Sequence, residues 1–234
     1  MSIFGFTIDE PSTGGDWLPI VQYDARAGRL FRTDRAQDTD GSWTSVKEDI
    51  TNSFKAVCDF ENLETGWIDY ATGGAPSFVL VPRGQLLPPK PNDNHKHGVR
   101  FMLKLSKDCG GDRPVRELSG NSRAFLTGTQ ALVEQYLREA PQHPGQLPAI
   151  VLDKTTPVKS GSGDRSSTNY HPTWKIVGWV ARPADLVPKP RAASQAQANG
   201  SGQQAAPSTG SQRPSTPPPP PQQASQTVSP DDFG

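Results

Sequence analysis

The 234-residue chain lacks an excess of charge and is poor in cysteine. Its 24 basic residues equal its 24 acidic ones, so no overall field predicts a nucleic-acid or membrane partner, and any basic surface must be local. Two cysteines, Cys58 and Cys109, are too few for a disulfide scaffold. No apolar run reaches about 18 residues, and the first residues do not resemble a signal peptide. We therefore expect a cytoplasmic protein of a bacterium or an infected host cell, with no membrane partner.

Hydrophobic residues are also scarce, and the shortage is concentrated at one end. They make up 33% of the chain, which also contains 24 prolines and 22 glycines. After residue 188 the composition changes, and 31 of the 46 residues in 189–234 are Pro, Gln, Ser or Ala. Such a segment cannot bury enough surface to offset its ordering entropy. We predict one folded domain over 1–188, followed by a disordered tether over 189–234.

Short apolar and alternating runs in the first 188 residues predict seven or eight strands. Two hairpins are expected, one around residues 25–28 and one between 54–60 and 66–71. In the run 97–107, Phe101 alternates with Arg100 and Lys104, so these two cations are expected on the exposed face. Trp174 and Trp179 are five apart and should lie on opposite faces, unless a bulge at Gly178 intervenes.

One amphipathic segment predicts a helix. Leu132, Val133, Tyr136 and Leu137 form one stripe, the helix should start near residue 127 or 129, and Pro141 should end it. Many short strands, Gly/Pro-rich loops and a single helix are typical of small β-barrels. The predicted fold class is therefore mainly β, an oligonucleotide-binding (OB)-like small β-barrel with one helix.

Signals for catalysis or metal binding are weak. Cys58, His95, His97 and Cys109 lack zinc-ligand spacing. The segment 38–41 starts like a calcium loop but lacks the later ligands. The segment 159–170, "KSGSGDRSSTNY", is either a flexible loop or a loop whose amides contact phosphate. No nucleophile–base arrangement has a local signature, so we predict no enzyme, no cofactor and no metal site.

Local positive charge and interleaved aromatic rings give the clearest functional signal. Between residues 83 and 107 six cations accompany a single acid, and the first hairpin adds a second basic cluster. Cations that contact phosphate and flat rings that stack on bases are what binding of single strands requires. A solvated sheet face and a hydrophobic core are the alternative explanations for the same residues. The candidate nucleic-acid-binding residues are Tyr23, Arg26, Arg29, Phe31, Arg32, Trp67, Tyr70, Lys96, Arg100, Lys104, Lys107, Arg165, Tyr170 and Trp174.

The chain ends in "TVSPDDFG", with two acids beside the only aromatic residue of the tether. A basic, aromatic-bearing β domain, a Pro/Gln/Ser-rich linker and an acidic-aromatic tip together resemble single-stranded DNA-binding proteins of bacteria and bacteriophages. The resemblance implies that Asp231, Asp232 and Phe233 dock replication, recombination or repair proteins. Two features depart from that family, because the acidic run is short and Gly234 follows the phenylalanine.

The sequence therefore predicts a protein that binds single-stranded DNA without strong sequence preference and recruits partners through its tip. A homo-oligomer is compatible with this prediction. The alternative is a structural or interaction β-domain, of a virion or a scaffold, with a flexible Pro-rich tail. An enzyme such as a nuclease ranks third, because no catalytic site can be assembled.

Overall fold

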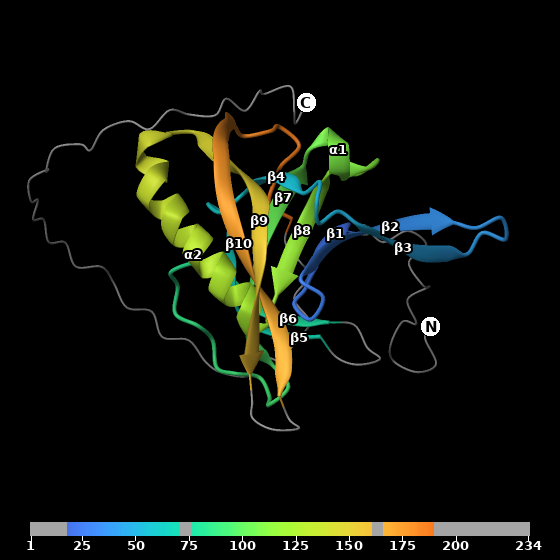
Figure 1. The fold of residues 1–234 in the computed structure, drawn as a ribbon, viewed down its shortest axis with the longest axis horizontal. Helices are drawn as coiled ribbons and strands as arrows, with labels where there is room; N and C mark the ends of the chain where they lie inside the picture. Colours follow the sequence, from blue (N-terminus) through green and yellow to red (C-terminus); the bar gives the residue numbers. More distant parts are fainter. Residues whose placement is uncertain (1–17, 71–75, 161–165, 190–234) are drawn as a thin grey trace, which may run out of the picture.

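The structure, a computed structural model, describes residues 18–70, 76–160 and 166–189, and these form an open, mainly β sheet with one long helix (Figure 1). The strands are β1 (Ile20–Asp24), β2 (Arg29–Gln37), β3 (Trp43–Asp49), β4 (Lys55–Cys58), β5 (Glu64–Asp69), β6 (Ser77–Pro82), β7 (Lys96–Leu105), β8 (Val115–Gly120), β9 (Gln146–Ser160) and β10 (Ser167–Ala181). The helices are α1 (Lys107–Gly110), α2 (Arg123–Glu139) and the single 3-10 turn η1 (Ala140–Gln142).

The strands follow the order β10-β9-β4-β7-β8-β1-β2-β3, and β5 and β6 extend the sheet beside the first half of β7. Neighbours are antiparallel except β1 and β8, which are parallel. The hairpin around residues 25–28 is confirmed: its turn ends at Gly28, whose φ of 67° favours glycine. In Figure 1 the β2–β3 hairpin projects away from the rest of the sheet.

The predicted second hairpin is wrong. β4 pairs with the end of β7 and β5 with its beginning, so the two strands lie one after the other along β7 and do not pair with each other. The partner of β5 in a hairpin is β6. At ten residues, β7 is long enough to pair with both strands, and no local pattern in the sequence reveals such a shared partner.

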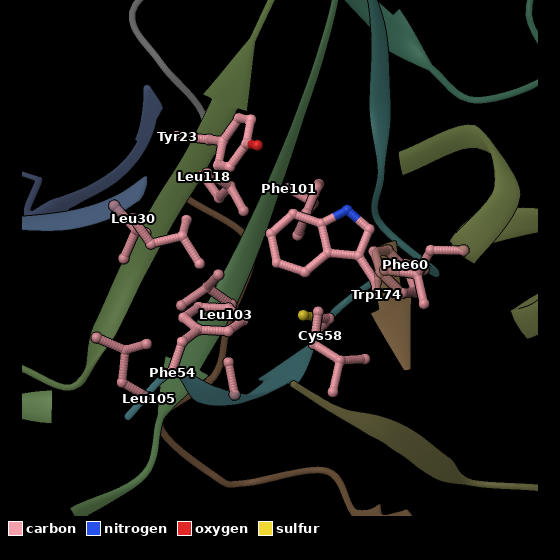
Figure 2. Packing of buried hydrophobic residues seen from close by; sticks show 14 of the residues in the cluster. Tyr23, Leu30, Phe54, Cys58, Phe60, Phe101, Leu103, Leu105, Leu118 and Trp174 are labelled. Atoms are coloured by element: carbon pink, nitrogen blue, oxygen red, sulfur yellow. The ribbon is translucent and has the colours of Figure 1, made fainter. Parts of the chain in front are cut away.

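The main hydrophobic core lies on the side of the sheet that α2 covers, which we call the inner face. Figure 2 shows Trp174, Phe54, Phe101 and Leu118 packed closely in this core. Phe125 of α2 joins the same cluster. Phe54 and Trp174 meet at a tilt with ring centroids 5.6 Å apart, and Phe125 stacks on Tyr23 at 6.1 Å. These contacts fix the inner face as the interior of the fold.

The opposite side of the sheet, the outer face, is only half covered. A smaller core formed by Val57, Met102, Leu147, Ala149, Val180 and Leu186 fills one part of it. Leu186 belongs to residues 182–189, which we call the strap. Arg182 holds the strap to Asp59 through two hydrogen bonds of 2.8 Å. The remaining part of the outer face, over β1, β2, β3, β5 and β6, carries half-buried and exposed side chains.

The helix α2 begins earlier than its apolar stripe predicts. Ser122 caps the helix, because its hydroxyl accepts a hydrogen bond from the Phe125 amide at 3.3 Å. The cap adds a turn that places Phe125 in the core. Gly128 then faces β10 so closely that a Cβ atom there would lie 2.3 Å from the Pro172 carbonyl oxygen. The helix ends at Glu139, before Pro141, as the sequence predicts.

Both tryptophans of β10 face the main core. The pairing of β10 with β9 shifts register between Ile176 and Gly178, so a bulge reverses the alternation between Trp174 and Trp179. Trp174 is buried in the core, and Trp179 stacks on His143 with ring centroids 4.5 Å apart. The bulge that the sequence left open is therefore present, and neither indole lies on the outer face.

Candidate nucleic-acid interface

The register of the β2–β3 hairpin sorts its side chains onto two faces. Phe31 lies opposite Asp49, Arg35 opposite Ser45 and Gln37 opposite Trp43, and directly opposed residues share a face. Leu30 points into the main core, so the odd-numbered residues of both strands lie on the outer face. This face of the hairpin carries Arg29, Phe31, Arg35, Trp43 and Lys47.

On the inner side of the same hairpin, the basic and acidic side chains pair with one another or with neighbouring strands. Arg32 pairs with Asp34 at 2.9 Å and with Glu48, and it donates to the Cys109 carbonyl oxygen at 2.8 Å. Asp34 also accepts from the buried guanidinium of Arg116 at 2.6 Å. Arg32, a predicted DNA contact, therefore stabilises the hairpin through these contacts. The cations of the hairpin that remain at the surface are mainly those of its outer face.

A second group of rings lies on the outer face over β5 and β6. Tyr70, 43% exposed, reaches across β7 and donates its hydroxyl hydrogen to Ser119 Oγ on β8 at 2.9 Å. Its ring meets that of Phe78 edge-on, with centroids 6.0 Å apart. Lys96 lies opposite Ile68 in the β5–β7 ladder and therefore shares the outer face. The Ile68 side chain packs over Gly98, where a Cβ atom would lie 2.4 Å from Ile68 Cδ1.

The two groups form one surface. Gln22 on β1 lies opposite Phe31, and Lys47 Nζ donates to Gln22 Oε1 at 3.1 Å. Since β1 pairs with β8, Phe31 lies two strand spacings, about 10 Å, from Ser119. We call this surface the aromatic–basic patch. It comprises Arg29, Phe31, Arg35, Trp43, Lys47, Tyr70, Phe78 and Lys96, with Gln22 and Ser119 between them.

Two predicted stacking residues are unavailable to bases, and that prediction is corrected. Tyr23 and Trp174 are buried in the main core, with ring centroids 6.2 Å apart. The Tyr23 hydroxyl donates to the Tyr170 carbonyl oxygen at 2.8 Å. Burial, with a smaller effect of Asp24, raises the pKa of Tyr23 far above its usual value. Both rings therefore stabilise the fold.

The expectation that Arg100 and Lys104 are exposed is also wrong. Arg100 pairs with Glu117 at 2.8 Å and with Glu64 at 2.5 Å, and it donates to the carbonyl oxygen of Lys189. Lys104 pairs with Asp185 at 3.0 Å. The predicted alternation along β7 is correct, because Phe101 and the two cations lie on opposite faces. The strap, however, covers the face that carries the cations. These two cations therefore anchor the strap.

The other candidates lie apart from the patch. Trp67 is on the inner face, stacked on His97 at 4.2 Å and donating its indole N–H to the Pro88 carbonyl oxygen at 2.8 Å. Arg26 is exposed in the β1–β2 turn, where Tyr170 donates its amide N–H to the Ala25 carbonyl oxygen at 2.7 Å. Lys107 is exposed in α1. Arg165, Asp231, Asp232 and Phe233, with nearly all of the predicted tether, lie outside the described residues.

An apolar cleft of about 320 Å³ opens on the inner side, between α2 and the β5–β7 ladder. Leu63, Val99, Leu126 and Val133 form much of its wall, and Arg83 lies at its edge. Thr129 also lines the cleft, and its buried hydroxyl oxygen has no hydrogen-bond partner among the residues that the structure describes. The cleft is suited to burying an apolar group and lies on the side of the sheet opposite to the patch.

The potential zinc ligands do not come together. Cys58 and Cys109 are separate buried thiols, and His95 contacts Asn92 Oδ1 at 2.8 Å and Ser77 Oγ at 3.2 Å. Within residues 18–70, 76–160 and 166–189, no group of three or more His, Cys, Asp or Glu side chains is arranged to hold a metal ion. Burial, assisted by Asp59, raises the pKa of the Cys58 thiol well above its usual value.

We expect neither thiol to react in the native protein. Both thiols are buried away from reagents, and the raised pKa of Cys58 leaves that residue with little thiolate, the reacting species. Dithionitrobenzoate should therefore release about two equivalents only in denaturant, and almost none under native conditions at pH 8. Fast release from the folded protein would contradict the burial of both side chains.

The described part of the chain contains no helix that is long and apolar enough to cross a membrane. No protein-family model, no curated protein and no solved structure matches the chain. Arguments about its function therefore rest on the geometry of the patch and on the sequence.

Proposed function

We propose that this protein binds single-stranded DNA, without strong sequence preference, on the aromatic–basic patch. The observation that carries the proposal is the register of β2 and β3, which gathers Phe31, Trp43 and Lys47 on one side while Arg32 is neutralised on the other. Tyr70 and Lys96 continue the same mixture of rings and cations across the sheet.

The patch has the features that unpaired strands require. Trp43 and Tyr70 are exposed and Phe31 is half-buried, so their rings offer surfaces on which successive bases stack. Each stacked base contributes about 1–3 kcal/mol. Asp49 is the one acid that shares the outer face of the β2–β3 hairpin, and the cations of the patch outnumber it: Arg29, Arg35, Lys47 and Lys96. Glu64 and Glu117, on the same side of the sheet, are paired with Arg100. Stacking and charge do not depend on base identity, so weak sequence preference follows.

In this proposal the sheet is a divergent OB-like barrel. The amide of Tyr170 donates to the Ala25 carbonyl oxygen, so the start of β10 approaches the β1–β2 turn at the place where a barrel would close. The patch then lies on the outside of the barrel, and α2 packs against the core. OB folds bind oligonucleotides on an outer strand surface of this kind.

The proposal includes recruitment of replication, recombination or repair proteins by Asp231, Asp232 and Phe233. Its support is the acidic and aromatic ending of the chain, which suits a partner site that combines cations with an apolar pocket. The preceding Pro/Gln/Ser-rich segment would let the tip reach such partners while the patch holds DNA.

Oligothymidylate is expected to quench the intrinsic fluorescence of the protein at low salt. Trp43, 61% exposed, is on the patch, whereas Trp174 is buried and Trp179 is stacked on His143. If three or four phosphates are contacted, log K should fall with log salt at a slope of about −2 to −3.

Trp43→Phe is the matched control for the fluorescence experiment. It should abolish most of the quenching while changing the affinity little, because phenylalanine keeps a ring on the patch. Absence of binding in about 20 mM salt, measured by anisotropy of a labelled oligonucleotide, would contradict the proposed function.

A further inference from the structure

The strand β3 ends the sheet, and no strand in residues 18–70, 76–160 and 166–189 pairs with its outer edge. Among the described residues it pairs with β2 alone, and all seven of its residues are exposed. Two of them, Trp43 and Val46, are large apolar residues that are 61% and 49% exposed. A long exposed edge strand with apolar side chains is a template for pairing with another strand.

The hydrogen bonds of the hairpin show which groups this edge presents. Ile50 donates its amide N–H to the Leu30 carbonyl oxygen at 2.9 Å, and Asp38 donates to Ser42 at 2.8 Å. Bonded and non-bonded pairs alternate in an antiparallel ladder, so Thr44, Val46 and Glu48 bond to β2. The N–H and C=O groups of Trp43, Ser45, Lys47 and Asp49 therefore point away from the sheet.

We infer that β3 pairs with β3 of a second copy of this chain, antiparallel and centred on Ser45. A two-fold axis perpendicular to the sheet brings the two edges together and keeps the outer faces on the same side. Ser45 then lies opposite Ser45 of the second copy, and about six main-chain hydrogen bonds form through Trp43, Ser45 and Lys47.

Charge selects this register. Centring the pair on Lys47, Glu48 or Asp49 would oppose identical charges. Centring it on Thr44 would place Glu48 opposite Asp40, and centring it on Trp43 would place Glu48 opposite Asp38. Only Ser45 and Val46 remain as centres within the strand.

Trp43 decides between these two centres. The Ser45 centre places Lys47 of each copy beside Trp43 of the other, which allows two cation–π contacts. The Val46 centre instead places Asp49, already paired with Arg29 at 2.7 Å, beside the ring. The Ser45 register also makes the outer faces of the two copies continuous. The pairing itself does not depend on DNA.

An interface of one strand per copy is small, so the fraction of dimer should depend on protein concentration. Sedimentation velocity of the full chain at about 1 to about 100 µM therefore tests this inference. The mass should rise with concentration from the 25.3 kDa of one chain towards twice that value. Ser45→Pro should shift the midpoint at least about tenfold upward, because it removes an outward N–H at an edge position that tolerates proline. Ser45→Ala keeps the N–H and should behave like the wild type.

Charged variants test the register independently. Ser45→Glu and Ser45→Lys should each stay monomeric, since the centre opposes like charges, and an equimolar mixture should form heterodimers. Far-UV circular dichroism and unchanged thermal unfolding would show that each variant folds. Amide exchange at Trp43, Ser45 and Lys47 in the wild type should slow as concentration rises. A monomer at every concentration, a dimer unaffected by Ser45→Pro, or a Ser45→Glu dimer would overturn the inference.

Discussion

Replacement of Trp174 with alanine is expected to lower the free energy of unfolding by about 3–5 kcal/mol, the range for removing a large aromatic side chain from a packed core. Trp174 is 7% exposed and packs against Phe54 and Tyr23, with ring centroids 5.6 and 6.2 Å away. The surrounding strands belong to one sheet and cannot collapse freely into the space, so a cavity should remain.

Trp174→Phe separates packing from hydrogen bonding at the same position. The indole Nε1 of Trp174 is buried and has no hydrogen-bond partner within the described part of the chain. Phenylalanine keeps a ring in the core and removes this unsatisfied donor, which offsets part of the lost contact area. We expect Trp174→Phe to cost less than half as much as Trp174→Ala.

Urea unfolding monitored by far-UV circular dichroism measures these differences, with the denaturant slope expected to stay constant. Trp43→Ala, in dilute protein, is the surface control and should change the free energy of unfolding by no more than about 0.5 kcal/mol. A loss below about 1 kcal/mol for Trp174→Ala would show that Trp174 is not part of the packed core.

The sequence predicted the positions of helices and strands better than it predicted which segments pack against them. Alternation in β7 correctly separated Phe101 from Arg100 and Lys104, and proline correctly ended α2. The burial of the polar side of β7 could not be predicted, because it depends on Leu186 and Asp185, which lie about eighty residues later in an unremarkable loop. Long-range covering of this kind leaves no periodic signal.

Two strands were missed for opposite reasons. β3, with the sequence WTSVKED, is exposed on all seven residues and therefore lacks the apolar alternation of a half-buried strand. β8 contains Arg116 and Glu117, both fully buried, where charged residues normally indicate a surface loop. Contacts formed only in the folded structure compensate for the burial of these two charged side chains. One of them is the hydrogen bond from Arg116 to the Thr33 carbonyl oxygen at 2.9 Å.

The candidate interface was predictable in part. Arg29, Phe31, Tyr70 and Lys96 were chosen as interleaved rings and cations, and the register places them on one outer surface. Trp43 and Lys47 were not among the predicted residues, because both lie on β3 and that strand was not predicted. A tryptophan in a polar segment, shortly after the turn residues Asp40 and Gly41, is the signal that could have found them, since a core tryptophan normally has apolar neighbours.

Loss of both Phe31 and Tyr70 is expected to weaken binding of oligothymidylate by about 30-fold or more. Each ring stacks one base in the proposed complex, and removing a stacked ring costs about 1–3 kcal/mol, where 1.4 kcal/mol is tenfold in affinity. The rings lie on β2 and beyond β5, with Gln22 and Ser119 between them, so they should contact different nucleotides and their effects should add.

The variant to test is Phe31→Ala with Tyr70→Ala, measured by anisotropy across a range of salt. Tyr70→Phe removes only the hydroxyl that donates to Ser119 and should change affinity less than about threefold, because the ring remains to stack. Leu137→Ala, at a 44% exposed position on α2, removes apolar surface on the far side of the sheet and should leave affinity unchanged.

Salt dependence distinguishes stacking from charge in the same experiment. Removing the two rings releases no phosphate contact, so the line of log K against log salt should move down with its slope preserved. Lys47→Ala and Lys96→Ala should instead flatten the line by about 0.7 for each lost phosphate contact. Equal affinity for the double ring variant and the wild type would show that bases do not stack on the outer face. A changed slope would show that the rings act by positioning cations.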